Sequence, residues 1–188
     1  DERGEEIKGN PARYLKVKGT GDSRAPFFTD EDEKRLLYEL SQMSNQNHLR
    51  LTKLALTTGF RRSELLSLTW RNIDLNKEKI YVQRKECAAR GASSSMRIVP
   101  LPTKAKKLLR SFENKEGKVL PLTKGSARNG FDKARKSAGL ETLRFHDLRH
   151  IAISRMWSYG MNALEISACS GHRDIKMLMR YSHYQLSF

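Results

Sequence analysis

The spacing of apolar residues in the first third of the chain is that of helices. Between residues 29 and 68, leucines recur at intervals of three and four, which places them along one side of a helix. Thr29 precedes a run of acidic residues, a sequence that caps a helix and suits the positive end of its dipole. The pattern predicts a helix over residues 29–40, a second at about 48–58 and, after Gly59, a third at 62–68.

The pattern changes after Asp74. The segments K-I-Y-V-Q-R and M-R-I-V-P-L are short and rich in β-branched residues, and each lacks the period of a helix. A polar stretch of small residues, from about 86 to 95, separates them. We predict two antiparallel strands joined by a long loop.

Helical spacing returns in the second half of the chain. Glycines and asparagines mark the ends of the segments, as they do at helix caps. The predicted helices cover about 103–112, 126–137 before Gly139, 146–159 before Gly160, a segment from Asn162 to Gly171, and a last helix capped by Asp174. The fold class we predict is α+β, mostly α-helical with one small antiparallel β-sheet.

The charge of the chain narrows the choice of partner. The 188 residues are enough for one domain with a sizeable core, and the 36 lysines and arginines exceed the 21 acidic residues by 15. With a pI near 10.0, the protein is expected to bind a polyanion, nucleic acid ahead of a membrane surface or an acidic protein.

The ends of the chain and its cysteines suggest where the domain works. Cys87 and Cys169 are too few for a disulfide framework, and no apolar run approaches the roughly 20 residues that span a bilayer, so we expect a cytoplasmic protein without a membrane partner. The chain opens with D-E-R-G-E-E rather than a signal peptide or an initiator methionine. Residues 1–24 are polar and Gly-rich, and we interpret them as a linker or arm that precedes a folded domain at 25–188.

The most distinctive chemistry lies between His146 and Tyr181. This stretch contains H-D-L-R-H, S-G-H-R-D and M-R-Y-S-H. His146, Arg149 and His150 are spaced at i, i+3 and i+4, so on a helix they share one face. A face of imidazoles and a guanidinium is suited to surround an anion.

Two further pieces complete a pattern with this stretch, in which Tyr181 follows Gly171-His172 by nine residues. They are T-G-F-R-R-S-E-L-L-S-L-T-W at 58–70 and the predicted hairpin with Lys85 at the end of its first strand. In this order and spacing, from about residue 26 onward, the chain resembles the catalytic domain of the tyrosine recombinases, the phage integrase family of site-specific DNA recombinases.

The resemblance implies a role for each matching residue. The two phosphate-binding arginines fall on Arg61 and Arg149, the histidines on His146 and His172, and the nucleophile on Tyr181. Two residues would support them: Glu64, which would brace the site, and His150.

The lysine and the tyrosine each have neighbours that compete for the role. The family's lysine falls on Lys85, with Arg84 and Arg90 as more remote substitutes. Tyr184 lies close to Tyr181, but only Tyr181 fits the R-Y-x-H frame.

The chemistry follows from the residue types. A phosphodiester can be broken without a metal when two guanidiniums donate bidentately to the phosphate oxygens and stabilise the charge that develops there. A tyrosine hydroxyl, with a pKa of about 10, becomes a useful nucleophile only in such a cationic pocket, and a lysine can protonate the leaving 5′-oxygen. We therefore expect strand breakage and rejoining through a 3′-phosphotyrosine, without metal, cofactor or ATP.

The resemblance also implies partners. These are a double-stranded recombination site, other protomers in a synaptic tetramer, possible accessory DNA-bending factors, and a nucleoid setting in a bacterial or phage-encoded system. Family members carry a separate N-terminal core-binding domain. Residues 1–24 would be part of the linker to that domain. Basic residues outside the catalytic set are expected to contact DNA: Arg62, Lys124, Arg128, Lys133, Arg135 and Lys136.

Three alternatives remain open. Type IB topoisomerases use the same nucleophile chemistry, but they usually carry lysine at the position of His146. A DNA-binding module could keep the fold without the activity. A zinc site could use His146, His150, Cys169 and His172, although Arg149 on the same face would repel the metal and the glutamate of an H-E-x-x-H site is missing.

Overall fold

Helix α2 is central in the fold, and the other elements are arranged around it. The computed structural model describes residues 28–83, 96–172 and 174–179. Leu51, Leu54 and Ala55 of α2 are almost fully buried, and the helix packs against α1, α4, α5 and α6. The helices are α1 (Asp30–Ser41), α2 (Asn47–Thr58), α3 (Arg62–Ser67), α4 (Thr103–Arg110), α5 (Lys124–Ser137), α6 (Asp147–Ser158), α7 (Ala163–Ser170) and α8 (Lys176–Met179).

Helix ends follow the capping residues of the sequence. The Thr29 hydroxyl accepts from the Asp32 backbone N–H, and the Asp32 carboxylate accepts from the Thr29 N–H, which confirms the predicted start of α1. Asn162 and Glu165 form the same reciprocal box at the start of α7. Each box satisfies backbone donors that have no partner inside the helix.

The sheet has three strands, one more than predicted. Strands β2 (Lys79–Gln83) and β3 (Met96–Pro100) pair antiparallel as expected, and β1 (Ile73–Asp74) adds a third strand at the edge of β2. In the register, Ile80 lies opposite Val99 and Val82 lies opposite Arg97. All four of these side chains are buried, so an arginine occupies an inward position of the sheet.

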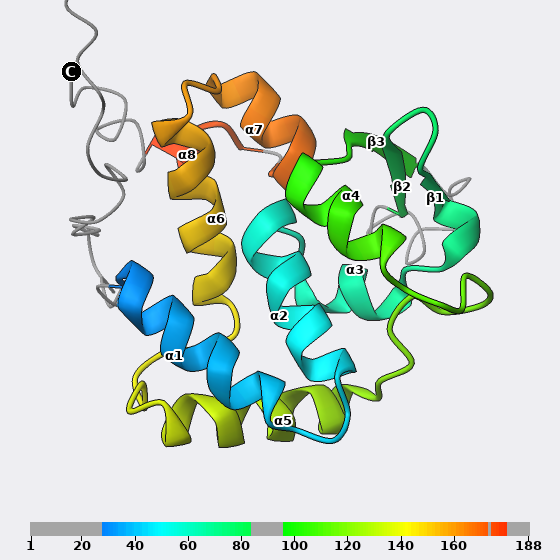
Figure 1. The fold of residues 1–188 in the computed structure, drawn as a ribbon. Helices are drawn as coiled ribbons and strands as arrows, with labels where there is room; N and C mark the ends of the chain where they lie inside the picture. The colour runs from blue at the N-terminus through cyan, green and yellow to red at the C-terminus, as the bar shows by residue number, and fades with distance from the viewer. Residues whose placement is uncertain (1–27, 84–95, 173, 180–188) are drawn as a thin grey trace, which may run out of the picture.

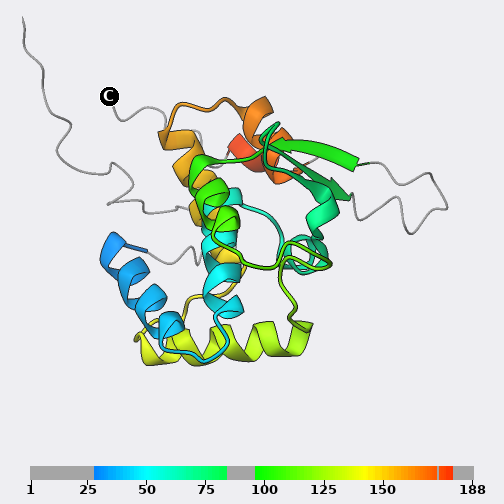
Figure 2. The same cartoon turned by 45° about the vertical axis from the view of Figure 1, so that its right-hand side comes forward.

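The helices and the sheet occupy different parts of the molecule. Helices α1 and α5 lie together at one end of the molecule and α7 and α8 at the other, while the sheet lies along one side (Figures 1 and 2). Helix α7 packs against both α6 and β3, so α7 meets the helix that His146 caps and the strand that carries Arg97.

The predicted fold class, mostly helical with a small antiparallel sheet, is confirmed. The arm at residues 1–24 and the loop at 86–95 lie outside the described residues and stay predictions. None of the helices within the described ranges is long and apolar enough to cross a membrane.

Candidate active site

Arg149 joins three helices at one point. It lies in the first turn of α6 and is only 3% exposed. Its Nη1 donates to the carbonyl oxygens of Gly59 and Ser170, each at 2.7 Å. These carbonyls close α2 and α7, where backbone acceptors lack helical partners. The guanidinium therefore satisfies two helix ends and is held rigidly by them.

His172 lies directly beside this guanidinium. Gly171 ends α7 in the left-handed conformation, at a φ of 73°, and so turns the chain back toward Arg149. The Ser170 hydroxyl donates to the Ile166 carbonyl and lies 2.7 Å from His172 Nδ1. Because its proton is already donated, the hydroxyl accepts from Nδ1–H, and this assigns the tautomer of the ring. Arg149 Nη2 lies 3.2 Å from each ring nitrogen, and in this tautomer it is Nε2 that has the lone pair to accept from it.

The surroundings of the two site histidines favour their neutral forms. Burial is the largest cause that lowers the pKa of His172 to about 4, and the charges of Arg149 and Arg61 act in the same direction, followed by His150 and His146. Partial burial and Arg149 also lower the pKa of His146, against the opposing effect of Asp147. Positive groups that disfavour further positive charge form a site suited to an anion.

His146 stands at the rim of a small cavity. The helix begins at Asp147, so His146 is its N-cap rather than a residue of the first turn. Its ring meets that of His150 edge-on, with centroids 5.0 Å apart. The cavity holds about 180 Å³ and is lined by Phe60, Arg62, Phe145, His146 and Arg149. The guanidinium of Arg62 lies 5.8 Å from the centre of the Phe145 ring, within the range of a cation–π contact.

Arg61 and its carboxylate neighbour Glu64 lie at the start of α3. Arg61 caps α3, and its backbone N–H donates to Glu64 Oε2 at 2.8 Å, while Nη1 lies 3.4 Å from Oε1. The Arg61 side chain remains 39% exposed and that of Glu64 only 7%. Arg61 is thus anchored at its backbone and open to solvent at its guanidinium.

Sequence reasoning missed Arg97. This buried residue of β3 donates from Nη1 and Nη2 to the two oxygens of Glu64, at 2.8 and 3.1 Å. Burial alone would raise the pKa of Glu64, but the hydrogen bonds and charge of Arg97, with those of Arg61, lower it overall. The signal was present in the alternation of β3, which puts Arg97 on the same side as Val99.

Other predicted residues lie away from this cluster or outside the described chain. Lys85, Tyr181, Arg84, Arg90 and Tyr184 fall outside the described residues, so their roles stay predictions. Helix α5 packs chiefly on α1 and α2. Its Lys124, Arg128, Lys133 and Lys136 are exposed, whereas Arg135 is largely buried and pairs with Asp132 at 2.8 Å.

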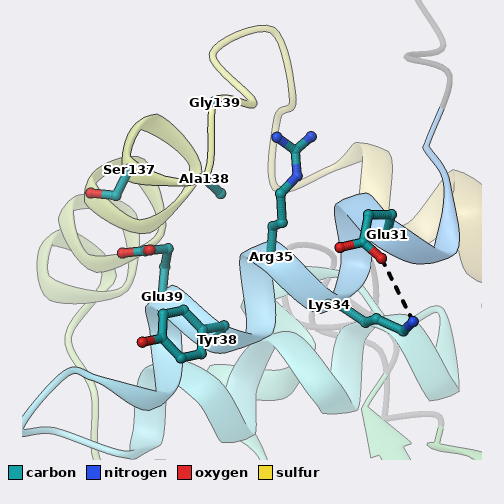
Figure 3. Close-up of a pocket in the computed structure, with 8 residues that line it drawn as sticks. All are labelled: Glu31, Lys34, Arg35, Tyr38, Glu39, Ser137, Ala138 and Gly139. Atoms are coloured by element: carbon teal, nitrogen blue, oxygen red, sulfur yellow. Dashed lines mark ion pairs between the residues drawn. The ribbon is translucent and has the colours of Figure 1, made fainter.

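Two further hollows lie elsewhere on the described part of the molecule. One, of about 460 Å³, lies between α1 and the end of α5, where Figure 3 shows Lys34 paired with Glu31 across an exposed 3.6 Å contact. A larger groove of about 660 Å³ is mostly apolar, with Leu37, Leu56 and Met156 among its lining residues. Neither brings together, from the described residues, a set of groups suited to phosphate. Within the described ranges, no three His, Cys, Asp or Glu side chains gather as metal ligands would.

Known proteins provide an independent comparison. The sequence profile of the phage integrase family matches residues 26–187. The shufflon-specific DNA recombinase of Escherichia coli is 34% identical over 179 residues, which cover 93% of this chain and 44% of that protein. The integrase of Salmonella phage P22 is 26% identical over 190 residues, 92% of this chain and 47% of that protein.

The fold is also that of solved structures. The catalytic domain of bacteriophage HP1 integrase superposes with a TM-score of 0.67 at 26% identity, covering 84% of this chain and 86% of that one. XerA recombinase gives a TM-score of 0.64 at 21% identity, over 86% of this chain and 60% of that one. The chain spans less than half the length of the recombinase and the P22 integrase that it matches.

Proposed function

The chain belongs to the phage integrase family, and on that premise we propose that it is the catalytic domain of a site-specific DNA recombinase. The observation that carries the proposal is the placement of Arg149. Two helix-end carbonyls hold it beside His172, and it lines a cavity with His146. A fixed guanidinium next to neutral imidazoles is preorganised for a phosphodiester.

Arg61 and Arg149 would share the non-bridging oxygens of the scissile phosphate. Their forked donors match a phosphate better than the single ammonium group of lysine does. His172 Nε2 and His146 would add contacts at the rim. Because the charge on these oxygens grows as the reaction proceeds, the guanidiniums stabilise the transition state more than the ground state.

The covalent step would be a transesterification. The Tyr181 hydroxyl oxygen attacks phosphorus and forms a phosphotyrosyl bond, while the bond from phosphorus to the 5′-oxygen breaks. The tyrosyl proton passes to solvent water as the attack proceeds, and Lys85 gives a proton to the departing 5′-oxygen. Rejoining reverses these steps with a 5′-hydroxyl, and one ester replaces another, so no ATP is needed.

The partners we propose follow from charge and family. The net charge of +15 suits a DNA duplex containing a recombination site, and recombination in this family implies further protomers in a synaptic tetramer. Accessory DNA-bending factors and a nucleoid setting in the cytoplasm complete the proposal. Residues 1–24 would connect this domain, at 25–188, to a core-binding domain.

The test is covalent capture on DNA. The 188-residue chain is first offered duplexes with a randomised centre, and bound sequences are enriched and rebuilt with a nick that prevents rejoining. We expect an SDS-resistant adduct with the wild-type chain and with Tyr184→Phe, and none with Tyr181→Phe. Binding without an adduct for the wild-type chain would leave a DNA-binding module and overturn the proposal.

A second readout separates the topoisomerase alternative. If the chain forms the adduct and relaxes supercoiled plasmids carrying the selected site without exchanging strands between them, the topoisomerase reading holds. The presence of histidine rather than lysine at His146 favours strand exchange. Recombined plasmids that appear only when both partners carry the site support the recombinase.

A further inference from the structure

Glu64 receives two arginines, although one would neutralise it. Arg97 takes both carboxylate oxygens in a bidentate pair in which each side chain is 7% exposed. Arg61 reaches the same carboxylate at a longer 3.4 Å and remains far more exposed. Two cations and one anion leave one positive charge on the group, and the exposed partner, Arg61, is the one that faces solvent.

The contact distances indicate which arginine neutralises the Glu64 carboxylate. A two-point contact inside the protein holds Glu64 more tightly than a single long contact near the surface does. Without Arg97, the buried carboxylate would be left with Arg61 as its nearest cation among the described residues. Arg61 would then be drawn inward, and its charge would be cancelled before a phosphate could bind.

Arg97 is also fitted to the turn that places His172. A Cβ added at Gly171 would lie 2.8 Å from Arg97 Cζ and Nη1, closer than any side-chain carbon normally approaches. On another side, the guanidinium carbon lies 5.4 Å from the centre of the Phe60 ring. Arg97 therefore touches the chain just before Arg61 and just before His172, from the strand that follows the predicted lysine loop.

We propose that Arg97 is a positioning residue of the active site: by neutralising Glu64, it keeps the charge of Arg61 free for the scissile phosphate. The inference rests on the proposed function, because it concerns how Arg61 is made available for cleavage. It differs from a merely structural role, in which Arg97 would stabilise the fold and leave the charge of Arg61 unchanged.

The first test is a double-mutant cycle at Arg97 and Glu64. Adduct formation is timed on the selected nicked duplex for the wild-type chain and for Arg97→Leu, Glu64→Gln and the double variant, at a temperature at which circular dichroism shows all four folded. Arg97→Leu should slow the reaction about 100-fold, as loss of an oriented charge does. Removing the carboxylate as well should raise the rate about tenfold above that of Arg97→Leu, because no carboxylate is then left to neutralise the charge of Arg61. A double variant as slow as Arg97→Leu, or slower, overturns the proposal.

A neutral phosphate provides the second test. A methylphosphonate at the scissile position carries no charge, so its cleavage depends less on the guanidinium charge of Arg61. The slowing caused by Arg97→Leu should shrink at least about tenfold on this linkage, by the same charge argument. A defect equal on both substrates would identify a structural residue. This readout also covers the case in which the Leu variant is less stable, because both rates come from one protein.

The two proposals fail in different ways. If the wild-type chain forms no adduct on any selected duplex, the proposed function fails. If the wild-type chain reacts and the Arg97 variants react equally fast on the normal phosphate, only the role of Arg97 fails. Arg97→Lys is a further comparison: it keeps a cation but not the two-point pairing, and it should react at a rate between those of the wild-type chain and Arg97→Leu.

Discussion

The guanidinium of Arg149 is held in place by contacts within the protein. Nη1 donates to two carbonyl oxygens and Nη2 lies beside His172. Arg149→Lys replaces a planar fork with one ammonium group, which cannot reach both carbonyls and still face the cavity. Because a buried acceptor without a partner costs about 1–3 kcal/mol, urea denaturation should show a loss of that size. Adduct formation should slow by about 100-fold to 1,000-fold.

The matched control is Arg110→Lys on α4. Arg110 is exposed, so its replacement should change stability by less than about 0.5 kcal/mol and leave the cleavage rate intact. If Arg149→Lys behaves like Arg110→Lys, the carbonyl contacts do not hold the guanidinium in the way we describe.

His172 should make stability depend on pH. Its pKa in the folded chain is about 4, against an ordinary 6.5, so between these values the unfolded chain binds more protons than the folded one. Stability therefore falls as pH drops from about 7 toward 4 and is fully recovered above the ordinary pKa. His172→Gln removes this contribution, so the stability difference between variant and wild type should shift in favour of the variant at pH 5.

Thermal unfolding of both proteins at several pH values provides the measurement. His48, His146 and Glu64 also have lowered pKa values, so the wild-type curve alone does not isolate His172. The difference between the two proteins does. A difference that stays constant from pH 7 to pH 5 would show that the ring titrates at its ordinary pKa.

The roles of single residues could be predicted from the sequence where the residues belong to a motif. Arg61, Arg149 and His172 were assigned through the resemblance to the integrase family. In the structure Arg149 lies beside His172, and the charge of Arg61 also acts on that ring. Arg97 was not predicted, because an arginine is buried only when a partner meets it, and its partner Glu64 lies 33 residues earlier. The contact of Arg62 with Phe145 escaped for the same reason.

At the scale of elements, the contact between α2 and α5 depends on one missing side chain. Gly130 lies inside α5, where glycine normally costs about 1 kcal/mol relative to alanine. Here a Cβ would fall 2.4 Å from His48 Nδ1 on α2. Gly130→Ala should therefore destabilise the chain by about 1–3 kcal/mol through overpacking, although helix propensity alone predicts a gain. Urea denaturation decides the sign.

The partner substitution checks the cause. In a His48→Ala background the ring is gone, so Gly130→Ala should regain its ordinary helical benefit of up to about 1 kcal/mol. The same sign in both backgrounds would contradict the close packing. Gly125, whose added Cβ would come no closer than 3.9 Å to a side chain, supplies the control for the alanine substitution.

Elements with a clear period were predictable and the short ones were not. The helix caps at Thr29, Asn162 and Gly171 placed α1 and α7 to within a residue or two. Strand β1 has two residues, too few for any alternation, and it exists because Ile73 and Asp74 pair with Ile80 and Lys79. Its turn passes through Glu78 at a φ of 54°, an arrangement fixed by tertiary pairing rather than by local preference.

At the scale of the whole molecule, the excess of positive charge can attract DNA from any direction or bind it at one surface. Helix α5 carries four exposed basic residues, Lys124, Arg128, Lys133 and Lys136, and it leads through the following loop to Phe145 at the cavity. Phe131 of α5 meets Phe145 edge-on at 5.1 Å. Helix α5 therefore packs on the segment that lines the cavity, and the contact of its basic residues with the DNA backbone stays a prediction to be tested.

Salt dependence separates a local track from a general attraction. One variant changes the four α5 residues to Gln, and a matched variant changes Lys34, Lys104, Lys107 and Arg110, which are exposed on α1 and α4. Both variants have the same net charge, so a general attraction predicts equal affinity for the selected duplex at every salt concentration. If α5 binds phosphates, its variant alone should flatten the plot of log affinity against log salt, by about 0.9 for each phosphate that is no longer neutralised. Equal slopes would remove α5 from the interface and leave the long-range field of the protein as the source of binding, because counterions are released only where cations meet the backbone.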